Sequence, residues 1–443
     1  MEAGTSTLNR SAVGAASLGG LLFGFDTAVI AGVTDALRHN FHLSAAELGA
    51  AVSAALVGTL VGALGAGPPG DRFGSRTMLY WIAGAYIVSA IGSAVAGGLA
   101  MLVAFRFIGG LAIGGSSVLA PVYIAEVSPA ERRGQLVGLF QLSIVVGILA
   151  AYVSNFLIAR ALDGDLAWRI KLAVAAAPAL LFLLLLLRIP HSPRWLAQQG
   201  RIAEASAAIR TLRMGDPERL LAQFSAAATT APGSPARLSW ALHRRPILLA
   251  IALALFNQLS GINAILYYLG DIFAAAGFNA MSADLQAVAI GVANLLATLL
   301  GLAVIDRVGR KLLLLIGAIG TALALAAVAT IYTLGAGQMF LLPALIAFIL
   351  FFAVSQGAVI WVYLSEIFPT AVRARGQAIG SATHWGMNAI LAFGFPIVAQ
   401  YTQALPFWLF AAAMLVQFVI VWRYFPETRG ISLERLEGTL EGK

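Results

Sequence analysis

Twelve apolar stretches of about 20 residues, the length at which an α-helix crosses the hydrocarbon core of a bilayer, recur along this sequence. Of its 443 residues, 60% are hydrophobic and only 11% are charged, which is far more apolar than a soluble core requires. A membrane β-barrel would instead show short alternating segments. The stretches lie near residues 13–33, 47–67, 78–97, 100–125, 134–158, 169–189, 246–274, 285–305, 312–333, 339–365, 376–399 and 406–425. The pattern predicts an all-α membrane protein with twelve transmembrane helices.

The net charge of +8 indicates membrane topology, because of where the lysine and arginine residues lie. Basic residues fall almost entirely in alternate connections, and short basic loops stay in the cytoplasm. One side has Arg72, Arg76, Arg132, Arg133, the stretch 188–245, Arg307, Arg310, Lys311, Arg373, Arg375 and the tail after Arg423, and the other has little more than Arg38, Arg160, Arg169 and Lys171. We therefore expect cytoplasmic termini and no nucleic-acid partner.

Three loop motifs occur twice, in the same order. GPPGDRFGSR is answered by VIDRVGRK, EVSPAERRGQ by EIFPTAVRARGQ, and PHSPRW by PETRG, at spacings of 235, 240 and 236 residues. The repeats predict two six-helix halves with a substrate site between them near the middle of the membrane. We assign 13–190 to the first half, 191–245 to a cytoplasmic linker, 246–425 to the second half and 426–443 to a cytoplasmic tail.

The linker contains apolar residues at helical spacing, namely Ile202, Ala205, Ile209 and Leu212. This spacing favours short amphipathic helices on the cytoplasmic face over a flexible linker. The chain contains no cysteine, which excludes disulfides and thiolate metal sites. The first apolar stretch includes Asp26 and has no clear cleavage site, which indicates a retained span and not a signal peptide.

Asp26 and Arg106 are two ionisable residues that lie well inside predicted spans. A single charge there is costly and usually functional, so we predict that the two side chains face each other. An arginine keeps a neighbouring carboxylate ionised, whereas a desolvated carboxyl on its own favours the protonated form. Separating and rejoining the pair would therefore bind and release a proton. The alternative is a permanent salt bridge between the first and fourth spans.

The seventh span has an unusual number of neutral polar groups, with Asn257, Gln258, Ser260 and Asn263 in one short segment. On an ideal helix Gln258 lies about 140° from Asn263, so both line one site only if the helix breaks, and Gly261 offers the place. Amides both donate and accept hydrogen bonds without net charge, which suits the hydroxyls of a neutral polyol. The alternative role for these amides is to hold helices together.

The DRFGSR and DRVGRK loops, PHSPRW, SEIFPTAVRARGQ and the terminal PETRG resemble the sugar porter branch of the major facilitator superfamily, over residues 18–436. The resemblance implies a major facilitator fold and alternating-access transport of a neutral monosaccharide, either hexose or pentose. Proton-coupled sugar porters have an aspartate at the position of Asp26, where facilitative carriers have asparagine, so it also implies proton symport. We expect a monomer in a bacterial inner membrane, with sugar, proton and lipid as partners and no cofactor.

The resemblance also implies which residues bind the sugar. The matching positions are Phe23, Gln141, Gln258, Asn263, Tyr267, Asn294, Trp361, His384 and Trp385. The chain departs from the family at Asn257, where a glutamine is usual, at Gly357 and Ala358, where a Gly-Pro pair is usual, and at His384, where an amide is usual. His384 would donate to the sugar, titrate near neutrality, or serve as a satisfied buried histidine.

Charged residues at the cytoplasmic helix ends form a predicted gate. Its members are Asp71, Arg72, Arg76, Glu126 and Arg133 in the first half and Asp306, Arg310, Lys311, Glu366 and Arg373 in the second. In the family such groups tie helix ends together when the cytoplasmic side is closed. Ser75 replaces a usual arginine, so we expect a weaker latch in the first half. The alternative is that these charges only anchor the topology.

Other functions find less support in the sequence. An enzyme would need a phosphate-binding loop, a histidine pair at metal spacing or a nucleophile elbow, and none is present. A drug exporter would have a motif rich in glycine and proline in the fifth span, and a sugar sensor a long cytoplasmic tail. A proton-independent facilitator of sugar or of an inositol-like polyol is the nearest alternative.

Overall fold

The computed structural model describes residues 7–128, 133–162, 164–229, 238–368 and 372–429. Within these ranges the side chains of 7–10, 133–135, 137, 225–229, 280–281, 306 and 373–374 lie outside the description. Two compact units are present. Unit 1 comprises Met1–Asp26, Val57–Ala151 and Arg169–Ser234, and unit 2 comprises Thr27–Leu56, Tyr152–Trp168 and Pro235–Lys443. The units differ from the sequence halves because unit 2 includes segments from the first, second and fifth predicted spans.

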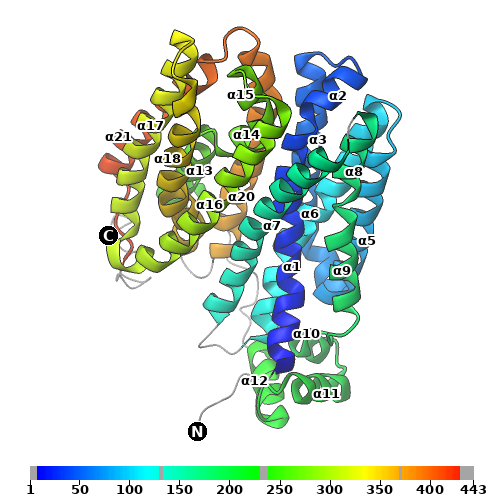
Figure 1. Ribbon diagram of the computed structural model, residues 1–443. Helices are drawn as coiled ribbons and strands as arrows, with labels where there is room; N and C mark the ends of the chain where they lie inside the picture. Colours follow the sequence, from blue (N-terminus) through cyan, green and yellow to red (C-terminus); the bar gives the residue numbers. More distant parts are fainter. Residues whose placement is uncertain (1–6, 129–132, 163, 230–237, 369–371, 430–443) are drawn as a thin grey trace. The chain divides into compact units, whose positions relative to one another are not determined.

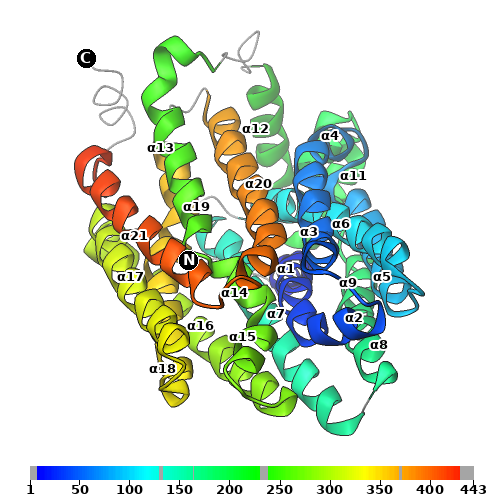
Figure 2. The same cartoon turned by 90° about the horizontal axis from the view of Figure 1, so that it is seen from above.

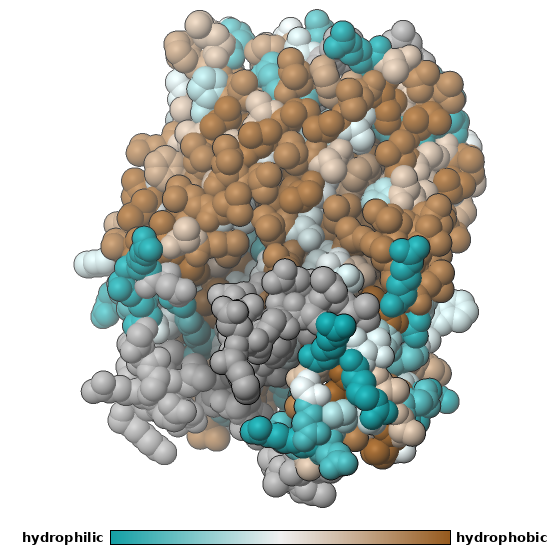
Figure 3. Space-filling view, turned by 60° about the horizontal axis from the view of Figure 1, so that its bottom comes forward, coloured by the Kyte–Doolittle hydropathy of each residue, from teal (hydrophilic) through white to brown (hydrophobic). Residues whose placement is uncertain are grey.

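The described part of the chain is helical throughout its regular elements, and eleven of its helical segments are long and apolar enough to span a membrane. The remaining predicted span, the eleventh (376–399), corresponds to α20 (Arg373–Ala399), whose hydropathy is lowered by polar residues such as His384 and Asn388. The predicted all-α membrane fold is confirmed. Figure 3 shows apolar side chains over much of the visible surface, with hydrophilic side chains toward the lower end of that view and along its upper edge.

The first half and the linker form helices close to the predicted spans (Figure 1). In chain order these are α1 (Thr7–Val29), η1 (Ile30–Gly32), α2 (Thr34–Asn40), α3 (Ala45–Gly65), α4 (Gly67–Phe73), α5 (Ser75–Ala94), α6 (Leu99–Val127), α7 (Arg133–Ala161), α8 (Asp165–Ala173), α9 (Ala176–Leu186), α10 (Pro193–Gln198), α11 (Ile202–Leu212) and α12 (Pro217–Thr229). The predicted linker helices are therefore present. Ala205, Ile209 and Leu212 are buried as expected, but Ile202 is 47% exposed because it begins α11 at the surface.

In unit 1, glycines let α1 and α7 approach closely. A Cβ on Gly24 would lie 1.8 Å from the carbonyl oxygen of Ile144, and one on Gly147 would lie 2.2 Å from that of Leu21. Small residues allow such backbone contact between membrane helices. The contact fixes the part of α1 that includes Asp26 against the middle of α7.

The second half is built from shorter pieces, because several of its spans are interrupted. Its helices are α13 (Trp240–Leu259), α14 (Ile262–Tyr267), α15 (Leu269–Ala275), α16 (Ala280–Val308), α17 (Arg310–Leu334), η3 (Gln338–Phe340), α18 (Leu341–Phe352), η4 (Ala353–Gly357), α19 (Ala358–Glu366), α20 and α21 (Leu405–Tyr424). In unit 2, α17 packs against α18 and α21, and α13 packs against α20 (Figure 2). The seventh and eleventh spans, which contain most of the polar residues, therefore pack directly against each other.

Equivalent hydrogen bonds recur in the two repeats. The Tyr123 hydroxyl donates to the carbonyl oxygen of Pro190 at 2.8 Å, and the Tyr363 hydroxyl donates to that of Pro426 at 3.0 Å. Pro190 and Pro426 begin the PHSPRW and PETRG motifs. The motifs therefore have the same structural task, which is to attach the end of each half to its fourth helix.

Candidate functional site

Asp26 and Arg106 form the ion pair that the sequence predicts. Arg106 Nη1 on α6 lies 2.6 Å from Asp26 Oδ1 on α1, and both residues belong to unit 1. The side chains are 5% and 11% exposed, so the pair is almost fully removed from solvent. Arg106 Nε is buried and has no hydrogen-bond partner among the described residues. The guanidinium is therefore held mainly by the carboxylate, and losing the carboxylate charge would leave a poorly compensated cation.

Two other predicted residues belong to the same unit. Phe23 is one turn before Asp26 on α1, and Gln141 lies on α7; both are partly buried. A Cβ on Gly20 would come within 2.4 Å of the carbonyl oxygen of Phe140, next to Gln141 in the chain. The α1–α7 contact thus positions Phe23 and Gln141 on two touching helices.

The seventh span breaks at the predicted glycine. Gly261 adopts a left-handed conformation, φ +81°, between α13 and α14. Ser260 closes the break, because its hydroxyl donates to the carbonyl oxygen of Asn257 at 2.6 Å and accepts from the N–H of Ile262 at 3.3 Å. A Cβ at position 261 would lie 2.2 Å from the ring of Phe410 on α21. Both backbone conformation and space therefore require glycine.

The break brings the predicted amides into one hydrogen-bonded chain. Asn263 Nδ2 donates to Gln258 Oε1 at 3.1 Å, and Gln258 Nε2 donates to Asn257 Oδ1 at 3.0 Å. Gln258 Nε2 also lies 3.1 Å from His384 Nδ1 on α20. Gln258 Nε2 is 3.2 Å from His384 Nε2 as well, and since an amide nitrogen can only donate, the ring accepts through whichever of its two nitrogens is unprotonated. The structure thus places His384 as a satisfied buried histidine, which agrees with one of the three predicted roles.

Aromatic side chains extend this cluster. His384 stands between Trp361 and Trp385, with ring centroids 5.2 Å and 5.0 Å away. Trp385 is buried, whereas Trp361 is 36% exposed. Tyr267 is buried and accepts a hydrogen bond at 3.1 Å from Asn388 Nδ2, also on α20. The structure therefore brings together most of the predicted residues of the second half. Asn294 is buried on α16 and is not part of this chain of hydrogen bonds.

Two buried amides of unit 2 were missed by the sequence analysis. Asn388 lies one turn beyond His384 on α20 and reaches Tyr267, and Gln356 lies in the π-helical turn η4. Gln356 Nε2 contacts Met414 Sδ at 3.2 Å, and its Oε1 is buried without a partner among the described residues. π-Helical turns inside α-helices are frequent at functional sites. An amide within an apolar span is the signal that would have found both.

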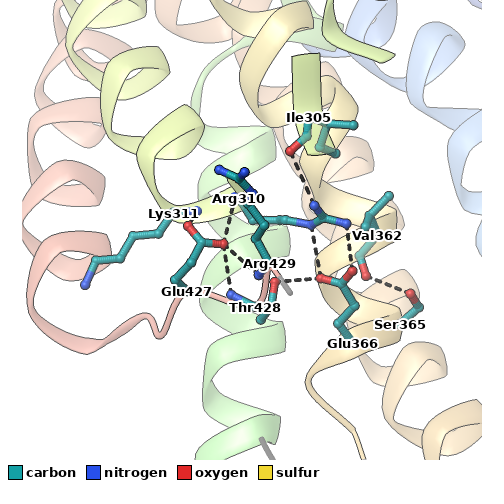
Figure 4. Close-up of polar contacts among 9 residues, drawn as sticks. All are labelled: Ile305, Arg310, Lys311, Val362, Ser365, Glu366, Glu427, Thr428 and Arg429. Carbon is teal, nitrogen blue, oxygen red and sulfur yellow. Dashed lines mark hydrogen bonds and ion pairs between the residues drawn. The ribbon is translucent and has the colours of Figure 1, made fainter. Parts of the chain in front are cut away.

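The predicted gate of the second half is an ion pair between α17 and α19 (Figure 4). Arg310 Nη2 lies 2.9 Å from Glu366 Oε1, and Arg310 Nε lies 3.3 Å from Glu366 Oε2. The Thr428 hydroxyl donates to the same carboxylate at 2.6 Å. Bidentate arginine–carboxylate geometry is among the strongest ion-pair arrangements. The side chains of Asp306 and Arg373 lie outside the described residues.

Glu427 of the PETRG motif caps α17 and was not predicted. Its carboxylate accepts hydrogen bonds from the backbone N–H groups of Arg310, Lys311, Thr428 and Arg429, at 2.9 to 3.1 Å. Burial alone would raise the pKa of Glu427, but these donors outweigh it and lower the pKa below its ordinary value. Lys311 itself donates to the carbonyl oxygen of Trp422. The motif therefore fixes the helix end that presents Arg310.

The first half does not form the matching pair among its described residues. Arg76 binds the Tyr80 hydroxyl at 2.8 Å and the carbonyl oxygen of Leu186 at 3.3 Å, and not Glu126. Ser75 occupies the position equivalent to Arg310. Glu126 instead has Ser192 as a hydrogen-bond partner.

Asp71 and Arg72 are exposed, and the Asp71 carbonyl oxygen accepts from Trp195 Nε1. The side chain of Arg133 lies outside the described residues. In this state Arg76 does not pair with Glu126, because it stands one residue beyond the position equivalent to Arg310, and the first-half latch stays a prediction.

A third ion pair lies in unit 2, at the opposite ends of the helices from Glu366. Arg38 Nη2 on α2 lies 3.2 Å from Asp271 Oδ1 on α15. The backbones also touch, because a Cβ on Gly270 would lie 2.6 Å from the carbonyl oxygen of Ala31. The sequence analysis used Arg38 only as a topology marker and overlooked Asp271, although it is an acid within the predicted stretch 246–274.

Comparison with known proteins agrees with this architecture. The model of the family described as "Sugar (and other) transporter" matches residues 12–439. The D-xylose-proton symporter of Escherichia coli is 35% identical and covers 96% of this chain and 94% of its own length. The glucose facilitated diffusion protein of Zymomonas mobilis is also 35% identical, over 95% of each chain.

Among solved structures, the inward-open xylose transporter XylE from E. coli superposes with a TM-score of 0.87 at 33% identity, covering 97% of this chain and 99% of XylE. The family match includes all twelve predicted spans and both repeats of the loop motifs. The helix break at Gly261, the amides beside it and the duplicated tyrosine–proline contacts all lie within the matched residues. The chain therefore belongs to the sugar transporter family, and it is a transporter and not an enzyme.

Proposed function

We propose that this chain is a secondary active transporter that couples the inward movement of protons to uptake of a neutral monosaccharide by alternating access. The observation that carries the proposal is the buried pair of Asp26 and Arg106 at 2.6 Å. A carboxylate held by a single guanidinium is ionised while the pair is intact, and becomes a proton acceptor when the two separate in a low-dielectric environment. The pair therefore supplies a proton site whose occupancy depends on conformation.

The sugar site is assigned to the amide chain of unit 2. Asn257, Gln258 and Asn263 satisfy one another in the described state, so a sugar hydroxyl would exchange with these hydrogen bonds. Trp361 and Trp385 flank His384 and offer apolar ring faces with an N–H at the edge, which suits the CH face and hydroxyls of a sugar. Phe23, Gln141, Tyr267 and Asn294 are the remaining proposed contacts.

A proton-independent facilitator is the second candidate, because a relative named as a facilitated diffusion protein is as similar as the symporter. The two hypotheses differ at Asp26. A facilitator has no need of a titratable group in this position, and the buried arginine would then be only a structural partner. An asparagine at position 26 therefore separates the hypotheses experimentally.

The deciding experiment is uptake of labelled xylose, arabinose and glucose into proteoliposomes, with and without a one-unit inward pH gradient. One proton per sugar supports about tenfold accumulation per pH unit, since each unit is worth about 1.36 kcal/mol. We expect accumulation by the wild type and only equilibration by Asp26→Asn. Asp35→Asn is the matched control, because Asp35 lies in the same region of the chain with a 73% exposed side chain. Accumulation by Asp26→Asn equal to that of the wild type would favour the facilitator.

The topology and the gate are part of the same proposal. We infer that both termini lie in the cytoplasm, the side that the basic connections favour, and that the chain acts as a monomer in a bacterial inner membrane. Arg310 and Glu366 then form a cytoplasmic contact between α17 and α19, and Arg38 and Asp271 an external one. Conformational change requires such contacts to form and part in turn.

A further inference from the structure

An apolar groove of about 450 Å³ runs between α13 and α21 in unit 2. Arg244 and Arg245 lie at one end, and Leu248, Ala252 and Ile420 form the walls. All of these residues lie on two helices that cross the membrane. The groove is therefore part of the lipid-facing side of the second half and is separate from the amide chain.

The sequence at the start of α13 explains why two arginines gather there. The helix is kinked at His243, where φ is −115° and ψ is 16°, and the ring of His243 hydrogen-bonds to the backbone of Ser239. After the kink, Arg244 and Arg245 are exposed at the first turn of the membrane-spanning part. Pro246 follows at a position where the backbone N–H is not needed for the new helical segment. The kink thus presents both guanidinium groups at the mouth of the groove.

Aromatic side chains lie at the corresponding ends of α13 and α21, and one of them, Tyr424, lines the groove. Trp240, Trp422 and Tyr424 are 59%, 62% and 59% exposed. Arg423 lies over the ring of Tyr424, with the guanidinium carbon 5.6 Å from the ring centroid. Exposed tryptophan and tyrosine mark the level of the headgroups, where their rings are partly solvated. The groove therefore begins at headgroup depth, with cations, and continues into the hydrocarbon region, with apolar walls.

We propose that this groove binds an anionic phospholipid, with its phosphate at Arg244 and Arg245 and one acyl chain along Leu248, Ala252 and Ile420. Charge complementarity selects the occupant: the groove has two arginines and no acidic residue among those that line it. Guanidinium groups bind phosphate through paired hydrogen bonds, and basic pockets between membrane helices bind anionic headgroups. A bound lipid would link α21 to α13, the helix that carries Asn257 and Gln258.

Native mass spectrometry of the delipidated transporter with added phosphatidylglycerol tests the proposal. We expect at least one retained phosphatidylglycerol, displaced neither by phosphatidylcholine nor by inorganic phosphate. Arg244→Gln with Arg245→Gln should weaken binding by about tenfold or more, because each basic residue contributes on the order of 1 kcal/mol near an anionic surface. Arg210→Gln with Arg219→Gln removes two exposed charges of the linker helices and is the control. Equal phosphatidylglycerol binding by both double variants would overturn the proposal.

A second variant tests the apolar part of the groove. Ala252→Trp places a large side chain in the groove without changing its charge, and we expect it to reduce phosphatidylglycerol binding while the arginines remain. Circular dichroism verifies that this variant is folded. Displacement of the lipid by inorganic phosphate alone would mean that the arginines are an anion site without an acyl-chain groove, and would refute the lipid assignment.

Discussion

Breaking the pair of Asp26 and Arg106 should be costly in a way that a double-mutant cycle can measure. Asp26→Asn keeps the shape of the side chain but leaves the guanidinium of Arg106 buried, with its Nε already lacking a partner among the described residues. Removing one partner of a buried ion pair costs about 3–5 kcal/mol. Domains of 150–250 residues lose about 2–4 °C per kcal/mol, so we expect a drop in melting temperature of roughly 6–20 °C.

Removing both charges should cost less than removing one. In Asp26→Asn with Arg106→Gln the uncompensated cation is gone, and neutral amides can hydrogen-bond across the same space. We therefore expect the double variant to recover at least half of the loss, which gives a large coupling energy between the two positions. The single variant Arg106→Gln should also be less stable than the double variant, because it leaves the carboxylate alone.

The assay is thermal unfolding of the purified protein in detergent, followed by tryptophan fluorescence and by the fraction that remains monodisperse. Asp35→Asn serves as the control, since Asp35 and His39 form an exposed pair with side chains 73% and 77% exposed, and exposed pairs contribute about 0–1 kcal/mol. If Asp26→Asn melts within about 2 °C of the wild type and the double variant is no better, the buried pair is not a significant stabilising contact. Uptake by each variant is measured well below its melting temperature.

Three further predictions concern other contacts. Gly261→Ala should lose sugar uptake and lower the melting temperature, because alanine is strained at φ +81° and meets Phe410; retained uptake would contradict the required break. Glu427→Gln should lower the melting temperature at neutral pH. Because folding lowers the pKa of Glu427, its stabilising effect is lost as the carboxylate is protonated, so the difference in melting temperature from the wild type should shrink as pH falls below about 4. Asp271→Asn should weaken the contact with Arg38 and increase labelling of a cysteine introduced at the position of exposed Asn40. The chain has no native cysteine, so the introduced thiol is the only one that reacts. Unchanged labelling would argue against a gate.

Much of the fold could be predicted because the membrane imposes simple rules on the sequence. A span must be long and apolar, so the twelve stretches located the helices, and only α20 fell short in hydropathy because of polar residues such as His384. The pairing of Asp26 with Arg106 followed from the cost of burying a lone charge. The break at Gly261 followed from the angle between Gln258 and Asn263 on an ideal helix.

The contacts that escaped prediction depend on which helices pack together. Asn388 reaches Tyr267 only because α14 packs against α20, and helical spacing alone does not define that neighbour. Arg76 appeared suited to Glu126, but the cation points to Tyr80 and Leu186. The sequence showed Glu427 only as part of the PETRG motif. Its capping role could not be predicted, because the N–H groups that it binds belong to the start of α17, more than 100 residues earlier in the chain.

The two repeats have kept their backbone contacts while their ion pairs have moved. At an offset of 237 residues Asp26 is opposite Asn263, and the residues 235 to 240 positions after Arg106 are the apolar segment LLPALI, so the second repeat has no equivalent membrane pair. At the helix ends next to the repeated loop motifs the situation is reversed, because Arg310 pairs with Glu366, whereas Ser75 stands at the position of Arg310 and Glu126 has Ser192 as its partner. In our proposal, the proton that Asp26 binds when it separates from Arg106 and the gate that opens when Arg310 separates from Glu366 therefore belong to different halves. Coupling between them requires that both pairs respond to one conformational change, and not that they share a residue.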